Sequence, residues 1–145
     1  MKPLEFPKFD FRYQKYQNKV RIFSTLRKKF IILTPEEWVR QNCVKFLITC
    51  KGFSPQLMRE EKSITINGLT KRCDIVCYHS SGKIRLIVEC KSTAVSISQD
   101  TFDQIARYNL ALNADYLMIT NGINHYYCSL DYENQTYHFM PNLPV

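Results

Sequence analysis

The stretch from Arg72 to Lys91, RCDIVCYHSSGKIRLIVECK, decides the fold that we expect for this chain. It contains two apolar runs joined by a Ser81-Gly82 turn, which is the pattern of an antiparallel hairpin. A two-residue and a four-residue loop centred on this turn give the same register, whereas a three-residue or bulged loop would change it. The expected opposed pairs are Tyr78 with Arg85, Val76 with Ile87, Asp74 with Glu89, and Arg72 with Lys91.

The expected register places the carboxylates of Asp74 and Glu89 side by side near one end of the hairpin. Opposed residues have Cβ atoms roughly 4.5–5.5 Å apart, so two ionised carboxylates repel there unless a cation lies between them or one keeps its proton. Mg²⁺ is one such cation, because it takes oxygen ligands and needs only one or two carboxylates. Lys91 lies on the same face, two residues beyond Glu89. Together these groups suit metal-assisted hydrolysis of a phosphodiester.

The same charges have a simpler explanation. Arg72, Asp74, Glu89 and Lys91 can form a solvated face whose side chains pair across the strands for a few tenths of a kcal/mol. These four residues alone favour that explanation. However, both faces of the hairpin are apolar just inside its charged end, which indicates strands that are buried on both sides. Charges at the end of a buried strand are costly, and this favours a functional role.

Composition indicates one folded domain. A chain of 145 residues, 45% hydrophobic and 13% aromatic, can bury a single core and does not belong to the disordered class. The first residues lack the apolar segment of a signal peptide, and no stretch approaches 18 consecutive apolar residues. We therefore expect a cytoplasmic protein without a membrane partner. Its six cysteines include no C-x-x-C pair, which argues against zinc and favours reduced cysteines packed as small apolar residues.

Basic residues are concentrated near the start of the chain. Residues 1–18 are basic and aromatic, and we expect an extended arm there, followed by a single domain over residues 19–145. Between Phe11 and Pro35 the chain has seven basic residues and no acidic one. Such a block is compatible with nucleic-acid binding and also with a solvated surface. The candidates for contacts with DNA phosphates are Arg27, Lys28, Lys29 and Arg72.

Local signals predict the other elements. Thr34-Pro35-Glu36-Glu37 has the pattern of a helix N-cap, and Gly52 is a suitable end for that helix. Asn67-Gly68 and Asn121-Gly122 are typical hairpin turns. The remaining expected elements are strands over 19–33, 56–66, 116–120, 123–130 and 137–140, and a second helix over 99–113. Their order predicts an α/β fold with one mixed sheet flanked by helices, αβββαβ, and an extra C-terminal hairpin.

With these elements placed, the sequence resembles the PD-(D/E)xK nuclease superfamily, whose core is restriction-endonuclease-like. Within it, the sequence is most similar to the N-terminal nuclease domain of type I restriction enzyme R subunits. The matching segments are LTPEEWVRQ (Leu33 to Gln41), KRCDIV (Lys71 to Val76), IVECK (Ile87 to Lys91), FDQIARYN (Phe102 to Asn109) and TNG (Thr120 to Gly122). They span roughly residues 20–130, and their order and spacing are more specific than any one of them.

The resemblance implies roles for particular residues. Asp74 and Glu89 would be metal ligands, with the Cys90 carbonyl as a further oxygen ligand. Lys91 would position or polarise the attacking water. Glu37 matches the acidic residue that many members place beside the metal, with Glu36 as its alternative. Gln104 and Tyr108 match a Q-x-x-x-Y motif that supports the active site or the DNA backbone.

The expected function is therefore Mg²⁺-dependent cleavage of DNA, with Mn²⁺ as a substitute metal. Cys73 stands where the superfamily has proline, and the chain has no P-loop motif, so we expect it not to translocate DNA by itself. Either it is a free-standing nuclease, or it works with a partner protein that supplies translocation or specificity, or it keeps the fold for another purpose. The oligomeric state is not indicated, and a dimer is compatible with the sequence. The alternatives are a catalytically silent DNA-binding or assembly module and a structural protein that binds neither DNA nor metal.

Overall fold

The computed structural model describes residues 3–144, in which nine strands form two sheets beside two α-helices and a short 3-10 helix at Pro55–Leu57. The large sheet has the strand order β4-β5-β6-β7-β8-β9, and the small sheet has the order β1-β2-β3. The strands of the large sheet are β4 (Met58–Ile66), β5 (Leu69–Tyr78), β6 (Ile84–Cys90), β7 (Tyr116–Thr120), β8 (His125–Asp131) and β9 (Thr136–Met140). The other elements are β1 (Tyr13–Tyr16), β2 (Lys19–Ser24), β3 (Lys29–Ile32), α1 (Pro35–Lys51) and α2 (Gln99–Leu110).

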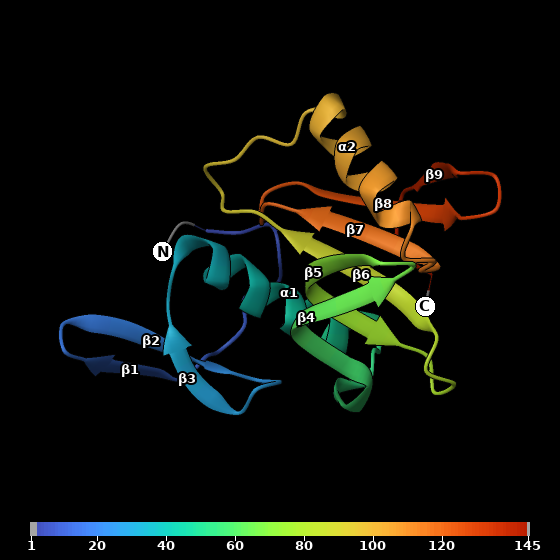
Figure 1. The fold of residues 1–145 in the computed structure, drawn as a ribbon. Helices are drawn as coiled ribbons and strands as arrows, with labels where there is room; N and C mark the ends of the chain where they lie inside the picture. Colours follow the sequence, from blue (N-terminus) through green and yellow to red (C-terminus); the bar gives the residue numbers. More distant parts are fainter. Residues whose placement is uncertain (1–2, 145) are drawn as a thin grey trace.

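The two helices cover opposite faces of the large sheet (Figure 1). Successive residues of β6 show this, because Leu86 and Val88 pack with the buried residues of α1, whereas Ile87 packs with those of α2. The expected α/β fold, a mixed sheet flanked by helices with an extra C-terminal hairpin, is confirmed. Within residues 3–144, no helix is both long enough and apolar enough to cross a membrane.

A crossover through α2 connects β6 to β7, which are parallel neighbours. The helix buries Phe102, Ala106 and Leu110 against the sheet, as its apolar periodicity predicts. It ends at Leu110, before the expected end at residue 113. This crossover brings the exposed side of α2 next to the end of β6, where the candidate site lies.

Helix α1 begins and ends where its sequence indicates. The Thr34 hydroxyl accepts a hydrogen bond from the Glu37 backbone N–H at 3.0 Å, and Pro35 occupies the first helical position. Gly52 ends the helix in the left-handed conformation, with φ of 73°. The Glu37 side chain does not close a capping box, because it is turned toward Arg27, Arg40 and Gln41.

The β5–β6 hairpin has the expected register through a different loop. Val76 pairs with Ile87, as predicted, and Ile75 with Val88. The predicted pairing of Tyr78 with Arg85 is wrong, because Tyr78 pairs with Ile84 and the register shifts next to it. A three-residue loop shifts the register by one residue, and the bulge at Arg85 shifts it back.

Two Asn-Gly turns join neighbouring strands, as predicted. Asn67 and Gly68 both have positive φ and form a two-residue turn between β4 and β5. The Asn121-Gly122 turn is longer than expected, because Thr120 pairs with His125. Its four residues are held by the Asn121 side chain, which accepts hydrogen bonds from two backbone N–H groups within the turn.

The residues before α1 pack on the body and then form the small sheet. The Glu5 backbone N–H donates to the Gly122 carbonyl at 2.7 Å, and Phe6 stacks on His125. The chain then enters the β1–β2 hairpin, whose turn at Gln17 and Asn18 contains the expected boundary at residue 18. The small sheet projects from the body at the lower left of Figure 1.

Candidate functional site

Asp74 and Glu89 lie immediately beyond the last paired residues of β5 and β6. The ladder between these strands ends at the Ile75–Val88 pair, and continuing it by one residue places Asp74 opposite Glu89, as expected. The Cys90 backbone N–H donates a hydrogen bond to the Asp74 carboxylate at 2.7 Å. The Asp74 carboxylate therefore accepts the hydrogen bond that a backbone carbonyl of β5 would otherwise accept, and it holds the ends of β5 and β6 together.

The backbone is irregular around Asp74. The residue of β4 that lies opposite Asp74 is Glu61. It has a φ of 50° and makes no ladder pair with β5. Side-chain alternation breaks at the same place, because Cys73 packs on the α2 side of the sheet and Ile75 on the α1 side. The break brings the Asp74 carboxylate within reach of Arg40 on α1, at 3.5 Å.

Glu89 is buried, and its carboxylate contacts the ammonium group of Lys71. Burial raises the pKa of Glu89, and the negative charge of Asp74 adds to this effect, while Lys71 and Lys91 partly offset it. The two carboxylates thus repel each other electrostatically, as the sequence predicts. The cation that now compensates Glu89 is Lys71, a residue that the sequence reasoning did not select.

Arg40 joins Asp74 to the acidic residues of α1 and β4. Its buried guanidinium lies 2.9 Å from a Glu61 oxygen and 3.4 Å from a Glu37 oxygen. Burial acts to lower the pKa of Arg40, but the surrounding carboxylates more than reverse this, so its pKa is raised. Glu37 therefore lies in the same charged cluster as Asp74. Glu36, the alternative acid, reaches Arg40 from the exposed side.

A shallow groove brings four of the predicted site residues together. Its volume is about 290 Å³. The residues that line it are Lys71, Glu89, Lys91, Gln104, Ile105 and Tyr108. Gln104 and Tyr108 come from the exposed side of α2, whereas Glu89 and Lys91 come from the end of β6, so the helix and the strand end form the two walls. The Lys71 ammonium lies 4.9 Å from the centre of the Tyr108 ring, a cation–π contact on the groove wall.

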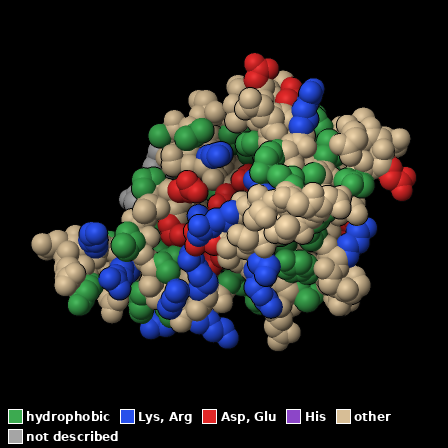
Figure 2. Space-filling model, in the orientation of Figure 1, with side chains coloured by type: hydrophobic (Ala, Val, Ile, Leu, Met, Phe, Trp, Pro, Cys, Tyr) green, Lys and Arg blue, Asp and Glu red, His purple; other side chains and the backbone are tan. Residues whose placement is uncertain are grey.

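Arg27, predicted to contact DNA, instead binds acidic side chains. It forms ion pairs with Glu37, Glu60 and Glu61 at 3.2–3.4 Å. Arg72 is paired with Glu61 at 2.8 Å, although its side chain is 66% exposed. Lys28 and Lys29 are exposed at the start of β3. Figure 2 shows the acidic side chains gathered near the centre of this face, with Lys and Arg side chains around them.

The donor set is suited to a hard cation. Residues 3–144 contain no group of three or more His, Cys, Asp or Glu side chains that could hold a metal ion. Asp74, Glu89 and the Cys90 carbonyl would provide two carboxylates and one backbone oxygen, which meets the need of Mg²⁺ for one or two carboxylates and several waters. A thiolate site is disfavoured because burial raises the pKa of Cys73 to about 12.

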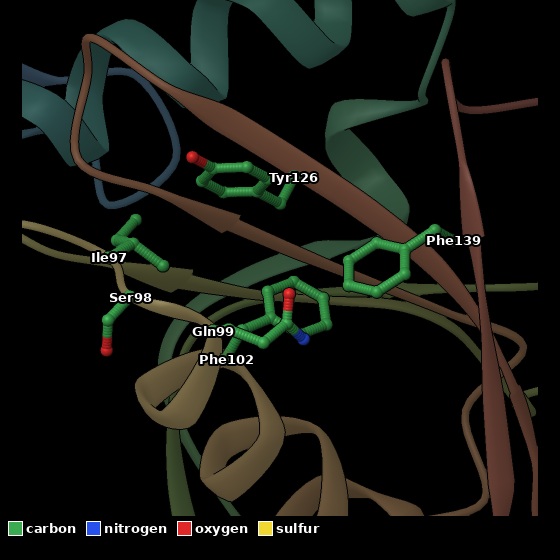
Figure 3. Close-up of a pocket in the computed structure, with 6 residues that line it drawn as sticks. All are labelled: Ile97, Ser98, Gln99, Phe102, Tyr126 and Phe139. Atoms are coloured by element: carbon green, nitrogen blue, oxygen red, sulfur yellow. The ribbon is translucent and has the colours of Figure 1, made fainter.

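A second pocket lies on the other side of α2 from the groove and has a different character. It has a volume of about 120 Å³, and Figure 3 shows aromatic rings from α2, β8 and β9 facing it. The residues lining it are Ile97, Ser98, Gln99, Phe102, Tyr126 and Phe139. None of them is charged, so this pocket offers no carboxylate, imidazole or thiol that could bind a metal ion.

Sequence reasoning missed the cations and acids that surround the predicted residues. Lys71 begins the matching segment KRCDIV, but the sequence reasoning gave it no role. Glu60 and Glu61 stand together in β4, and adjacent acids in a predicted strand were the available signal. Gln41 ends the matching segment LTPEEWVRQ and was also given no role, yet its buried amide donates to Glu37 at 2.9 Å and to Glu60 at 2.6 Å.

Comparison with known proteins gives one result. No curated protein matches the sequence. Residues 35–144 match the family described as the type I restriction enzyme R protein N terminus. The matched residues include both helices and the whole large sheet, and with them Asp74, Glu89, Lys91, Gln104 and Tyr108. The small sheet lies before the matched residues. The chain therefore belongs to the family of type I restriction enzyme R protein N-terminal domains.

Proposed function

We propose that this protein is a Mg²⁺-dependent DNA endonuclease whose active site joins Asp74, which does not itself line the groove, to Glu89 and Lys91 in the groove. The observation that supports this most is the composition of the groove, which combines a buried carboxylate, a lysine, an amide and a tyrosine from two separate elements. Family membership supports a nuclease-related domain. Charged groups of opposite sign at the end of a buried strand have little structural purpose by themselves.

Each residue has a distinct task in this proposal. Asp74 is fixed by the Cys90 N–H and Arg40, so it is the rigid ligand. Glu89 is the second ligand, and its carboxylate would exchange Lys71 for the metal. Bound Mg²⁺ supplies a water of lowered pKa and stabilises charge on the phosphate oxygens. Lys91 orients the water or the phosphate, and Gln104 and Tyr108 hold the DNA backbone against the groove wall.

The test compares Lys91→Ala with Lys83→Ala, which removes an exposed lysine from the other end of the β6 hairpin. We expect Lys91→Ala to abolish Mg²⁺-dependent cleavage of plasmid DNA while DNA affinity changes little. Lys83→Ala should cleave like the parent protein. Normal cleavage by Lys91→Ala would reject the role of Lys91.

Metal binding is measured separately from cleavage. Mn²⁺ should raise the unfolding temperature of the parent protein, because a ligand that binds only the folded state stabilises it. The variant Glu89→Gln should lose most of that increase. An equal increase in both proteins would show that the metal binds elsewhere.

A second candidate function is a DNA-binding module without catalysis. One observation favours it: both candidate ligands already bind protein cations, Asp74 through Arg40 and Glu89 through Lys71. Such a module would bind DNA in a salt-dependent manner and would show neither nicking nor stabilisation by Mn²⁺.

A further inference from the structure

One face of the small sheet packs on the body around Ile22 and Ser24, although its outer part also carries the exposed Lys15 and Lys29. On the inner face, Ile22 and Ser24 are fully buried. The Ser24 hydroxyl donates to Glu60 on β4 at 2.7 Å, and Arg27, at the end of the same hairpin, binds Glu37, Glu60 and Glu61. These contacts fix the small sheet to the body, so its outer face has a defined orientation.

The outer face alternates basic and aromatic side chains. Paired residues in the β1–β2–β3 ladder lie on the same face, which assigns its members. Its basic and aromatic members are Arg12, Tyr16, Lys19, Arg21, Phe23 and Phe30, and the two partners of Arg21, Gln14 and Ile32, lie on it as well. The Arg12 guanidinium lies 4.6 Å from the centre of the Phe23 ring and 5.5 Å from that of Phe30, and Arg21 lies 5.0 Å from that of Tyr16. The rings thus contact both guanidinium groups; the Nε of Arg21 is buried without a hydrogen-bond partner, so a phosphate would contact Arg21 through its terminal N–H groups.

The basic side chains of this face have no acidic partner. Among the described residues, Arg12, Lys19 and Arg21 make no ion pair, whereas Arg27 on the inner side binds three carboxylates. The chain from Phe11 to Leu33 contains no Asp or Glu, so the charge of the face is uncompensated within its own sheet. A surface of this kind is complementary to a polyanion.

We propose that this outer face binds the phosphate backbone of duplex DNA outside the catalytic groove. Duplex is favoured over single-stranded DNA because Arg12 and Arg21 cover the rings on which unpaired bases would stack. Flat guanidinium groups instead suit contacts with phosphate oxygens. The inference rests on the proposed action on DNA, and it assigns substrate holding to a sheet that precedes the family-matched residues 35–144.

The outer face adds Arg12, Lys19 and Arg21 to the residues proposed to contact DNA. All three belong to the basic block that the sequence marked as compatible with nucleic-acid binding, but choosing them within that block needs the strand register that separates the two faces. Arg27 and Arg72 already bind carboxylates, so we rank them below these three for phosphate contacts.

The experiment measures the salt dependence of DNA binding in EDTA, which excludes cleavage. The test protein carries Arg12→Gln, Lys19→Gln and Arg21→Gln. A matched control carries Lys51→Gln, Lys62→Gln and Lys83→Gln, which remove the same charge elsewhere. With a 20–30 base-pair duplex, we expect the test protein to bind at least about tenfold more weakly and the slope of log K against log salt to fall by about 2.7, since each phosphate contact contributes about 0.9. The control should change little.

A second variant guards against misfolding of the test protein. Lys19→Gln alone removes one charge that packs on no ring, and it should lower the slope by about 0.9. An unchanged slope in both variants, or equal weakening by the control, would overturn the proposal. Tighter binding of single-stranded than of duplex DNA by the parent protein would overturn the choice of duplex.

The outcome is separable from that of the proposed nuclease function. If the test protein binds DNA normally while the parent protein cleaves, the outer face is wrongly assigned and the nuclease proposal stands. If the test protein loses binding while no protein cleaves with Mg²⁺, the outer face is correctly assigned and the catalytic proposal fails.

Discussion

Replacing Arg40 by methionine tests the charged cluster that positions Asp74. Arg40 and Arg72 both bind Glu61, at 2.9 and 2.8 Å, but the Arg40 side chain is 6% exposed and that of Arg72 is 66% exposed. Arg40→Met and Arg72→Met therefore each remove an ion pair with the same carboxylate, but Arg40→Met also removes contacts with Glu36, Glu37 and Asp74. The comparison sets the buried cation of the cluster against an exposed cation at its edge.

The losses in the free energy of unfolding caused by Arg40→Met and Arg72→Met should differ severalfold. Removing one partner of a buried ion pair costs about 3–5 kcal/mol, because the carboxylates left behind lose their compensating charge. Arg40→Met leaves Glu37, Glu61 and Asp74 without this cation, so a cost in that range is expected at pH 7. An exposed pair contributes about 0–1 kcal/mol, which sets the expectation for Arg72→Met. Urea unfolding followed by circular dichroism gives both free energies.

The cost of Arg40→Met should depend on pH. The hydrogen bond from Arg40 is the largest cause that holds the pKa of Glu61 below its ordinary value. A carboxyl group whose pKa is lowered in the folded state stabilises the protein above the unfolded-state pKa of about 4.3, and this contribution is lost as the pH falls through the folded-state pKa. The difference between parent and variant should therefore be largest near pH 7 and should shrink below about pH 4.

Two results would refute this reasoning. A cost that stays constant from pH 7 to pH 3 would show that Arg40→Met acts through lost packing and not through the carboxylates. Equal costs for Arg40→Met and Arg72→Met at pH 7 would show that neither the burial of Arg40 nor its additional ion pairs control the energy of the cluster.

Two further predictions concern stability. Gly122→Ala should cost more than Gly68→Ala in thermal unfolding: both glycines have positive φ, but a Cβ at Gly122 would lie 2.7 Å from Leu4, whereas Gly68 faces open space. Equal costs would show that only backbone conformation matters. Thr34→Ala should cost about 1 kcal/mol in urea unfolding, because it removes the hydroxyl that caps α1. Thr34→Ser keeps the hydroxyl, so its loss in the free energy of unfolding should be clearly smaller.

Elements with local signals were predictable from the sequence. The Asn67-Gly68 turn, the Thr34 cap and the Gly52 end of α1 each depend on a few neighbouring residues, and all are found as expected. The placement of Asp74 opposite Glu89 followed from the pairing register of β5 and β6. That register survived a wrong loop prediction because the three-residue loop and the bulge at Arg85 offset each other.

Contacts between distant residues were not predictable in the same way. Arg27 and Glu60 are 33 residues apart, and nothing near either residue indicates its partner. Their pairing depends on how the small sheet docks on β4. Strand β1 also lacked a signal, because all four of its residues are exposed and no apolar alternation marks it. Arg27 was therefore assigned to DNA on the basis of charge, although the folded structure uses it as an internal cation.

The arrangement of cations around the groove suggests how metal and substrate would share it. A metal between Asp74 and Glu89 competes with Lys71 for the Glu89 carboxylate, so binding it requires the Lys71 ammonium to move. The Lys71 ammonium already lies 4.9 Å from the centre of the Tyr108 ring, so this cation–π contact would keep it on the groove wall after it leaves Glu89. Arg40, in contrast, is buried and lies 3.5 Å from the Asp74 carboxylate. In the proposed site, Asp74 would thus keep its protein partners while Glu89 exchanges Lys71 for the metal.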